Sequence, residues 1–314
     1  MSQPTPNADL DLWWANDSQK EQIAANAWEF VKQQGIVLPA NLPLRVIHEV
    51  AGLVSMVWVD GQPTPRGEFH IDPFDDGLLF GRGVWESTRT VKGYPWLWSM
   101  HVHRMEHTAQ VLNFKLDPER IPTREQVREF VHSLTDMEVV IRVNVSAGVP
   151  GYPGRVWMTA SLPPKPVTSV SLCTTRYPFL KSQPYLVWKT FQYATRLQIN
   201  QDAKKAGFDS ALLLDEDENI LEAVQANIFL RMPDGWITPT ADGGLLPGTT
   251  RQFLMTKGPY PVREQAIPVN LLRAAQEVYI TGSNVGIIPV TRIDDYQYPI
   301  GPETQQLLVW IEQN

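Results

Sequence analysis

The sequence predicts a two-domain chain that mixes helices and strands, in the α+β or α/β class. The chain has 314 residues, which is enough for two domains of ordinary size. Helical and strand patterns occur in both halves, and the proline-rich stretch PPKPV at 163–167 interrupts both kinds of pattern. We therefore expect an N-terminal extension with one helix at 1–50, a small domain at 51–162, a linker at 163–168 and a larger domain at 169–314.

The N-terminal half begins with one helix and continues with strands. Ser18 and Glu21 have the spacing of a capping box, apolar residues follow, and Gly35 ends the predicted helix. Alternating apolar residues and turn dipeptides such as Asp60-Gly61 and Lys92-Gly93 predict strands at 55–64, 78–91, 138–148 and 155–162. Two further helices are expected, one from a Ser99 cap to Phe114 and one from a Thr123–Gln126 capping box to about Leu134.

The C-terminal half continues the mixture. Apolar periodicity and the closing Gly207 predict a helix at 195–207. Further helices are predicted at 251–257, at 270–277 and at the C-terminus, and strands at 208–215, 219–224, 227–232 and 277–283.

Composition and charge exclude several classes of protein. Hydrophobic residues make up 43% and charged residues 19%, the balance of a soluble globular protein. No apolar run is long enough to predict a membrane-spanning helix, and the first residues lack the pattern of a secretory signal. The single cysteine, Cys173, excludes an internal disulfide and is typical of a reducing compartment, so a cytoplasmic location is expected. A net charge of −7 without a Lys/Arg block makes a nucleic acid partner unexpected.

The stretch YLVWKTFQYATR at 185–196 contains one lysine, Lys189, among aromatic and aliphatic residues. Such a lysine either extends its amine to water from a surface segment or keeps a desolvated amine. A desolvated amine is disfavoured as ammonium and can form a Schiff base with an aldehyde. The lysine by itself does not decide between these interpretations, so the neighbouring chemistry must.

Two segments offer donors for an anion. Gly248, Thr249 and Thr250 stand just before an apolar helix, where free backbone N–H groups and hydroxyls form a phosphate seat or simply cap the helix. The triplet TGS at 281–283 follows a strand and either adds donors to such a seat or is only a turn.

Two buried charges are also predicted. Arg104 lies in an apolar helix, where its guanidinium needs an anion: a ligand, or a nearby carboxylate. Glu222 ends a strand among apolar residues and needs a cationic partner, either a pyridinium N–H or an arginine. An amine, phosphate donors and an acid for a ring nitrogen are together the parts of a pyridoxal phosphate site.

The same residues lie in motifs that resemble the class IV aminotransferases, the fold type IV pyridoxal phosphate enzymes. That family includes D-amino acid and branched-chain aminotransferases and 4-amino-4-deoxychorismate lyase. The matching motifs keep the family's order and spacing between about residue 56 and residue 294, and they are FGRGVWES, HVHRMEHTA, LEAVQANIF, LPGTTR and TGSNVGIIPVTRID.

The resemblance implies a role for each candidate. Lys189 would be the Schiff-base lysine and would later shuttle a proton between the substrate Cα and the cofactor C4′. Glu222 would be the partner of the pyridine nitrogen. The phosphate would be held by Arg104, Thr249, Thr250 and Ser283.

Some positions depart from the family pattern. Arg82 replaces the aspartate between the two glycines, and it either binds a substrate carboxylate or faces outward. Gln192 stands where the D-amino acid enzymes and the lyase have asparagine, and Tyr193 comes one position earlier than the tyrosine of branched-chain enzymes. The candidate substrate-binding residues are Phe80, Arg82, Trp85 and Tyr193.

The resemblance favours an aminotransferase that moves an amino group between an amino acid, or a primary amine, and a 2-oxo acid, in a cleft between two domains of a homodimer. One alternative is a lyase that releases pyruvate from 4-amino-4-deoxychorismate, and another is a catalytically silent relative that acts as a binding protein. No metal is expected, because His101, His103 and His107 do not share one helix face and are interpreted as surface or packing residues.

Overall fold

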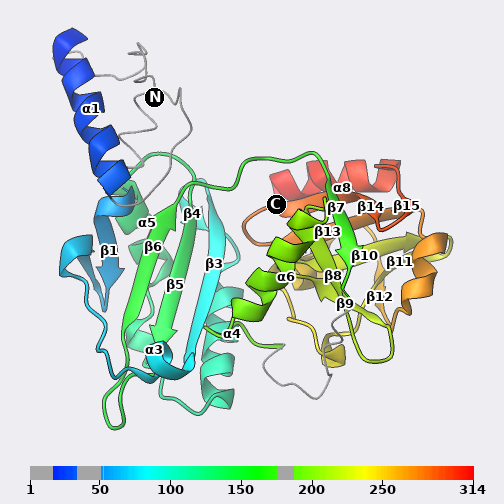
Figure 1. The fold of residues 1–314 in the computed structure, drawn as a ribbon, viewed down its shortest axis with the longest axis horizontal. Helices are drawn as coiled ribbons and strands as arrows, with labels where there is room; N and C mark the ends of the chain where they lie inside the picture. The colour runs from blue at the N-terminus through cyan, green and yellow to red at the C-terminus, as the bar shows by residue number, and fades with distance from the viewer. Residues whose placement is uncertain (1–16, 34–50, 52, 176–186) are drawn as a thin grey trace.

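Two β-sheets, each with its own helices, make up the described part of the chain, which is residues 17–33, 51, 53–175 and 187–314 of a computed structural model. Figure 1 shows them as two lobes side by side, with α1 (Asp17–Gln33) extending from the N-terminal lobe. The predicted first helix corresponds to α1, but Gly35 and the side chain of Ser18 lie outside the described residues.

The first sheet is antiparallel, with strand order β2-β1-β6-β5-β3-β4. Its strands are β1 (Met56–Val59), β2 (Gln62–Pro65), β3 (Gly83–Val91), β4 (Tyr94–Pro95), β5 (Val140–Ser146) and β6 (Val156–Ser161). The helices α4 (Trp98–Val111) and α5 (Arg124–His132) cover one face, where Met105 and Phe130 join Met158 in a buried apolar cluster. The turn at Asp60-Gly61 and the Thr123–Gln126 capping box are confirmed.

The second sheet is mixed, with strand order β12-β11-β10-β13-β14-β7-β8-β9 and β15 paired to β14. Its strands are β7 (Val170–Thr174), β8 (Ser210–Leu214), β9 (Ile220–Ala223), β10 (Asn227–Met232), β11 (Gly235–Thr238), β12 (Val262–Glu264), β13 (Glu277–Gly282), β14 (Gly286–Ile293) and β15 (Tyr296–Gln297). One face packs against α6 (Ala194–Lys205), α7 (Thr249–Lys257) and α8 (Pro302–Gln313), as Ile199, Leu254 and Leu307 show.

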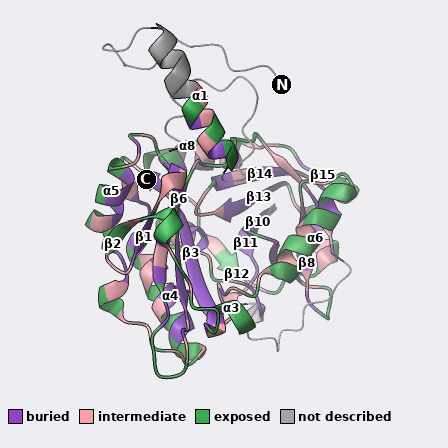
Figure 2. Cartoon of the chain, turned by 60° about the vertical axis from the view of Figure 1, so that its left-hand side comes forward, coloured by how far each residue is buried: buried purple, intermediate pink, exposed green. Residues whose placement is uncertain are grey.

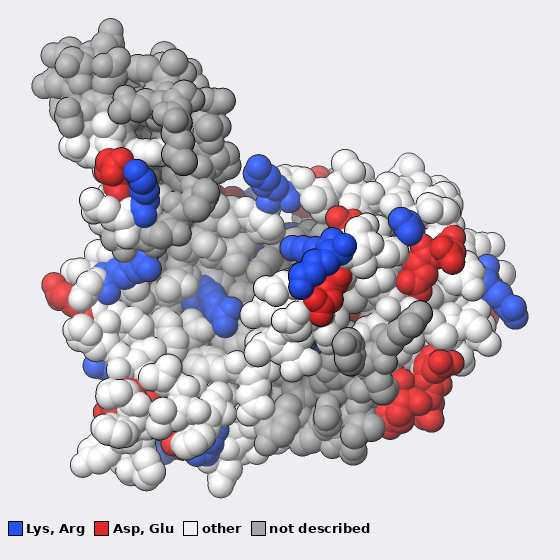
Figure 3. Space-filling view, in the orientation of Figure 1, with Lys and Arg blue, Asp and Glu red and all other residues white. Residues whose placement is uncertain are grey.

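Burial follows this layering, since buried residues concentrate on the strands and exposed ones on the outer helices (Figure 2). The predicted linker at 163–168 falls between the last strand of the first sheet and the first strand of the second. The domain boundaries themselves remain a prediction. None of the described helices is long and apolar enough to cross a membrane, and on the face drawn in Figure 3 basic and acidic side chains are interspersed.

The strand β3 joins the two lobes through the part of its edge that precedes its short pairing with β4. The Trp85 N–H donates to the Lys189 carbonyl at 3.0 Å, and the Phe191 N–H donates to the Gly83 carbonyl at 3.0 Å. Further along the strand, the Arg89 N–H donates to the Ser283 carbonyl at 3.3 Å. These backbone bonds hold two segments of the C-terminal half against one strand of the N-terminal half, so the position of each segment is fixed relative to β3.

The predicted strand at 78–91 is partly wrong, because its first residues form the short helix α3 (Asp76–Phe80). The Asp75 carboxylate caps this helix by accepting from the Gly77 N–H at 2.6 Å, and Gly81 ends it with φ of 68°. A glycine readily adopts this left-handed conformation. The strand therefore begins only at Gly83, and the apolar residues of α3 are displaced from the sheet.

Three other element predictions need correction. Ser99 does not cap α4, because the helix starts at Trp98 with Leu97 in the N-cap position and no capping side chain. The predicted helix at 270–277 is a 3₁₀ helix, Val269–Ala274. The strands β4, β7, β11, β12, β14 and β15 were not predicted. Pro289 interrupts the strand pattern of β14, and the pairing of β14 with β7 shifts its register just beyond this residue.

We expect Asp75→Ala to lower the melting temperature of the protein by several degrees. The buried carboxylate also accepts from the Ser146 hydroxyl at 2.6 Å and from the Gly148 N–H at 3.2 Å. Removing it leaves buried donors unpaired, at a cost of about 1–3 kcal/mol for each such group. Scanning calorimetry measures the change. Asp72→Ala, in which an exposed carboxylate is lost, is the control, and an equal effect in both variants would contradict this account.

Candidate functional site

A small cavity between the two lobes brings most of the predicted site residues together. It is lined by Arg104, Lys189, Tyr193, Glu222, Thr249, Thr250 and Ser283, and also by Arg196, Asn227 and Thr281. Its volume is about 60 Å³, which is small beside the roughly 300–1,000 Å³ that ligand pockets commonly hold.

Lys189 is half-buried, and its backbone is fixed on the edge of β3. Its Nζ lies 3.9 Å from the centroid of the Trp85 ring. Burial lowers the pKa of the Lys189 amine to about 8; the Glu86 carboxylate opposes this shift, and neighbouring guanidinium groups reinforce it. A larger fraction of the amine is therefore uncharged near neutral pH than in an exposed lysine, which is what a nucleophilic amine requires.

Glu222, on β9, is buried and already has several donors. The Oε1 atom accepts from Arg196 at 2.6 Å and from the Leu246 N–H at 3.2 Å, and Oε2 accepts from Asn227 Nδ2 at 3.1 Å. Burial raises the pKa of this carboxyl, while Arg196 and the Leu246 amide counteract the rise. A carboxylate oxygen has two lone pairs, so Oε2 can accept from one further donor in the cavity.

The interaction with Arg196 bears on the two cationic partners that the sequence allowed for Glu222, a pyridinium N–H or an arginine. An arginine was one of the two partners expected for Glu222, and Arg196 is that arginine. Sequence reasoning did not single out Arg196. Arg196 lies seven residues after Lys189 on α6, a helix whose residues are mostly polar. Its neighbours in the sequence give no sign of an interaction with Glu222, which is 26 residues away.

The first turn of α7 and the end of β13 form a group of hydroxyls, which we call the anion seat: Thr249, Thr250, Thr281 and Ser283. The Thr249 and Ser283 hydroxyls are 2.8 Å apart. The buried hydroxyls of Thr250 and Thr281 have no hydrogen-bond partner within the described part of the chain. No side chain caps α7, and a Cβ at Gly248 would collide with Asn227 Oδ1. Buried hydroxyls and free N–H groups at a helix start are suited to an anionic ligand.

Arg104 borders the anion seat and is held by Glu86. Its Nε and one terminal nitrogen donate to the two Glu86 oxygens at 2.7 and 2.8 Å, and the other terminal nitrogen donates to the Pro247 carbonyl at 2.9 Å. The carboxylate partner considered from the sequence is therefore present. Because a guanidinium has five N–H donors, Arg104 still has donors for a ligand.

His101 is a second residue that sequence reasoning missed, after Arg196. It was grouped with His103 and His107 as surface or packing residues, and those two are exposed. His101 itself is fully buried, with Nδ1 2.6 Å from Glu86 Oε2 and Nε2 3.2 Å from the Thr249 hydroxyl. Its spacing of three from Arg104 places both on one helix face, and that signal was available in the sequence. No metal-binding group of three acidic, histidine or cysteine residues occurs among the residues that the structure describes.

The substrate-binding candidates divide into two pairs. Trp85 lies under the Lys189 amine, and its ring meets the Tyr193 ring edge-on at 5.3 Å. Phe80 is 65% exposed on α3, and Arg82 pairs with Asp76 at 2.5 Å outside the cavity. Within this chain, Arg82 thus matches the interpretation of an outward-facing residue.

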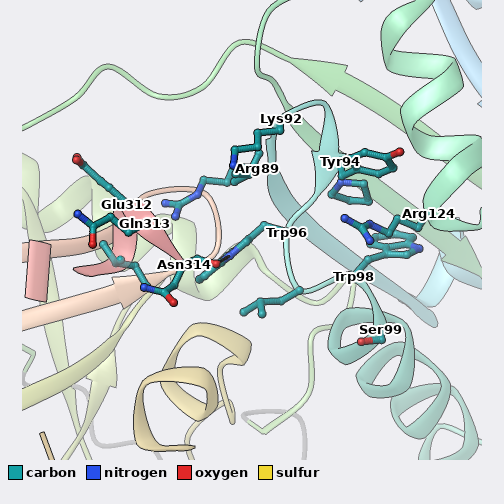
Figure 4. Close-up of a pocket in the computed structure, with 14 residues that line it drawn as sticks. Arg89, Lys92, Tyr94, Trp96, Trp98, Ser99, Arg124, Glu312, Gln313 and Asn314 are labelled. Atoms are coloured by element: carbon teal, nitrogen blue, oxygen red, sulfur yellow. Dashed lines mark hydrogen bonds between the residues drawn. The ribbon is translucent and has the colours of Figure 1, made fainter. Parts of the chain in front are cut away.

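A second cavity, of about 700 Å³, lies between β4, the start of α4 and the end of α8 (Figure 4). Tyr94, Trp96 and Trp98 supply aromatic walls, and Arg89 and Arg124 supply positive charge. None of the predicted site residues lines it. Most of the residues for which the sequence predicted this chemistry line the smaller cavity around Lys189 instead.

Comparisons with known proteins identify the family. The model of the family described as amino-transferase class IV matches residues 83–293, more than half of the chain. The aminodeoxychorismate lyase of Bacillus subtilis (strain 168) is 27% identical to this chain over 266 residues, which cover 77% of this chain and 88% of the lyase.

Solved structures of similar fold agree. The branched-chain aminotransferase of Thermoproteus uzoniensis, solved with norvaline, has a TM-score of 0.74 at 22% identity and covers 82% of this chain and 93% of its own. A hypothetical aminotransferase of Mycobacterium tuberculosis in a PLP-bound form has a TM-score of 0.75 at 21% identity, covering 82% and 97%. The predicted fold is confirmed, and the chain belongs to the class IV aminotransferase family.

Proposed function

We propose that this chain is a pyridoxal phosphate-dependent aminotransferase that moves an amino group between an amino acid, or a primary amine, and a 2-oxo acid. The observation that carries the proposal is the amine of Lys189. Its pKa is lowered to about 8, and it lines the same cavity as a buried carboxylate and the anion seat. An amine activated in this way is suited to react with an aldehyde whose phosphate the seat holds.

The residues present fit pyridoxal phosphate. Thr250 and Thr281 have unpaired buried hydroxyls that a phosphate would satisfy, and Arg104 adds positive charge beside them. Glu222 Oε2 can accept from a protonated pyridine nitrogen. When bound, the cofactor supplies an aldehyde for amines and a ring that withdraws electrons from the substrate Cα. Lys189, once its amine is free again, moves the proton at that Cα.

Arg142 supports a substrate that carries a carboxylate. It is exposed on β5, and its guanidinium carbon lies 3.8 Å from the centroid of the Trp85 ring, against which the Lys189 amine also packs. Among the described residues it has no acidic partner, and its Nε donates to Asn144 Oδ1 at 2.9 Å. A charged group so close to the reactive amine is well placed to bind the carboxylate of an amino acid or a 2-oxo acid.

The second candidate is 4-amino-4-deoxychorismate lyase, and the 27% identity to the Bacillus subtilis lyase supports it. A homodimer remains part of the proposal. The exposed apolar side chains of Phe74, Leu78 and Phe80 support it, because a partner subunit would remove them from water. A cytoplasmic location also stays an expectation.

Adding pyridoxal phosphate to the purified protein should give a visible absorption band, and the Lys189→Ala variant should lose it. The matched control is Lys204→Ala, which removes an exposed lysine from α6. A subsequent L- or D-amino acid should convert the cofactor to its amine form in an aminotransferase, whereas a lyase should instead release pyruvate from 4-amino-4-deoxychorismate. A band that persists without Lys189 would contradict the assignment of this amine.

The reactivity of Lys189 toward an amine-specific label should reach half its maximum near pH 8, because its pKa is about 8. Below the pKa the uncharged fraction rises about tenfold per pH unit, so labelling should increase steeply and then level off. Peptide mass spectrometry on the cofactor-free protein resolves Lys189 from the exposed Lys204, which should continue to gain reactivity above pH 9. Identical profiles for the two lysines would be evidence against a desolvated amine.

Arg142→Leu should raise KM for amino acids by about 10- to 100-fold, since a hydrogen bond to a charged group contributes about 1.5–3 kcal/mol. KM for a primary amine without a carboxylate should change little. Steady-state kinetics with both substrate types measures the difference. The control is Arg66→Leu, which removes an exposed guanidinium distant in sequence from Arg142 and should change neither KM. An equal rise of KM for both substrate types in Arg142→Leu would exclude a role of Arg142 in binding the carboxylate.

A further inference from the structure

A continuous chain of hydrogen bonds runs from the anion seat into the small lobe. The Ser283 and Thr249 hydroxyls are 2.8 Å apart, the Thr249 hydroxyl is 3.2 Å from His101 Nε2, and His101 Nδ1 is 2.6 Å from Glu86 Oε2. His101 is 0% exposed and Glu86 is 1% exposed. Neither imidazole nitrogen is accessible to water, so the protonation state of His101 decides which atom donates in each of its two hydrogen bonds.

The protonation state of Glu86, at the acid end of this series of hydrogen bonds, is fixed. Burial alone would raise the pKa of Glu86, but Arg104 and His101 hold it well below its usual range. Glu86 is therefore a carboxylate that only accepts, and His101 Nδ1 must carry a proton. Because Arg104 already compensates the Glu86 charge, a second cation is disfavoured, and burial lowers the pKa of His101. In the protein without an anion, Nε2 is consequently an acceptor, and the Thr249 hydroxyl donates to it.

An anion reverses this arrangement. Phosphate oxygens only accept, so Thr249 can bind one only by turning its hydrogen away from His101. His101 Nε2 and the Thr249 oxygen then face each other as two acceptors with no hydrogen between them, unless Nε2 gains a proton. Protonated His101 donates from both nitrogens, to Glu86 and to Thr249, and its charge lies beside the anion.

We infer that His101 is a positioning residue of the anion seat, which takes up one proton when a dianion binds and thereby turns the Thr249 hydroxyl toward that dianion. This inference rests on the proposed function in one respect only, which is that the anion seat binds an anionic group. The charged groups that face His101 are Glu86 from β3, Arg104 from α4 and Lys189 beside β3. The elements on the other side, α7 and the end of β13, present the hydroxyls of Thr249 and Ser283.

Sulfate is the probe, because it is a dianion that does not titrate near neutral pH and cannot react with Lys189. Calorimetric titration of the full-length, cofactor-free protein at pH 7, in two buffers of different ionisation enthalpy, gives the number of protons taken up per sulfate. At this pH Lys189, with its pKa of about 8, is mostly protonated already and contributes little. The wild-type protein should take up about one proton more than His101→Gln or Thr249→Val.

The two variants test different bonds. In His101→Gln the amide can donate to Thr249 without gaining a proton, so sulfate affinity should stay within a few fold while the uptake disappears. Thr249→Val leaves His101 and Glu86 in place but removes the hydroxyl that would turn, so the uptake should disappear there too. Melting temperatures show whether each variant is folded, and either variant suffices for the comparison.

Equal proton uptake in the wild-type protein and a folded variant would overturn the inference, and so would a wild-type protein that does not bind sulfate. Binding of pyridoxal phosphate is measured in parallel by absorbance. A protein that shows the His101-dependent uptake but no visible band with pyridoxal phosphate would retain the proton-coupled seat and lose the proposed function. A protein that shows the visible band with pyridoxal phosphate but no His101-dependent proton uptake would retain the proposed function and lose the proton-coupled seat.

Discussion

The site depends on the edge of β3 that β4 leaves unpaired before Thr90. A strand edge presents unpaired N–H and C=O groups, and here they bind the segment around Lys189 and the carbonyl of Ser283. The amine and one end of the anion seat are therefore positioned by backbone bonds to a single rigid strand. Side chains of the same strand complete the arrangement, since Trp85 contacts the amine and Glu86 orients Arg104. Alternation along the strand places these two side chains on opposite faces.

Charge compensation is the second constraint. Glu86 and Glu222 are both buried, and a buried carboxylate is costly unless it is paired and hydrogen-bonded. Arg104 and Arg196 meet this need, one from each lobe. Since each carboxylate is matched by its own guanidinium, the remaining positive charge of Lys189 and Arg142 is available to anionic ligands. The two carboxylates in turn orient Arg104 and Arg196 through the hydrogen bonds that they accept.

Local signals predicted the elements that local interactions form. The Thr123–Gln126 capping box and the Asp60-Gly61 turn need only a few neighbouring residues, and both are present. The errors arise where distant contacts decide the conformation. Asp75 caps α3 while also binding Ser146 and Gly148, 71 and 73 residues away, and β14 forms a strand despite Pro289 because it is paired on both sides. No window of sequence contains these partners.

The sequence by itself pointed to the family, which the comparisons confirm, and it singled out Lys189 and the hydroxyl-bearing turns as candidates, because these lie in short ordered motifs. Only the tertiary structure decided which charges meet. It paired Glu222 with Arg196 and Glu86 with both Arg104 and His101, and it left Phe80 and Arg82 outside the cavity. The physical reason is that a buried charge selects its partner by distance in space after the two lobes pack together, and spacing along the chain carries little of that information.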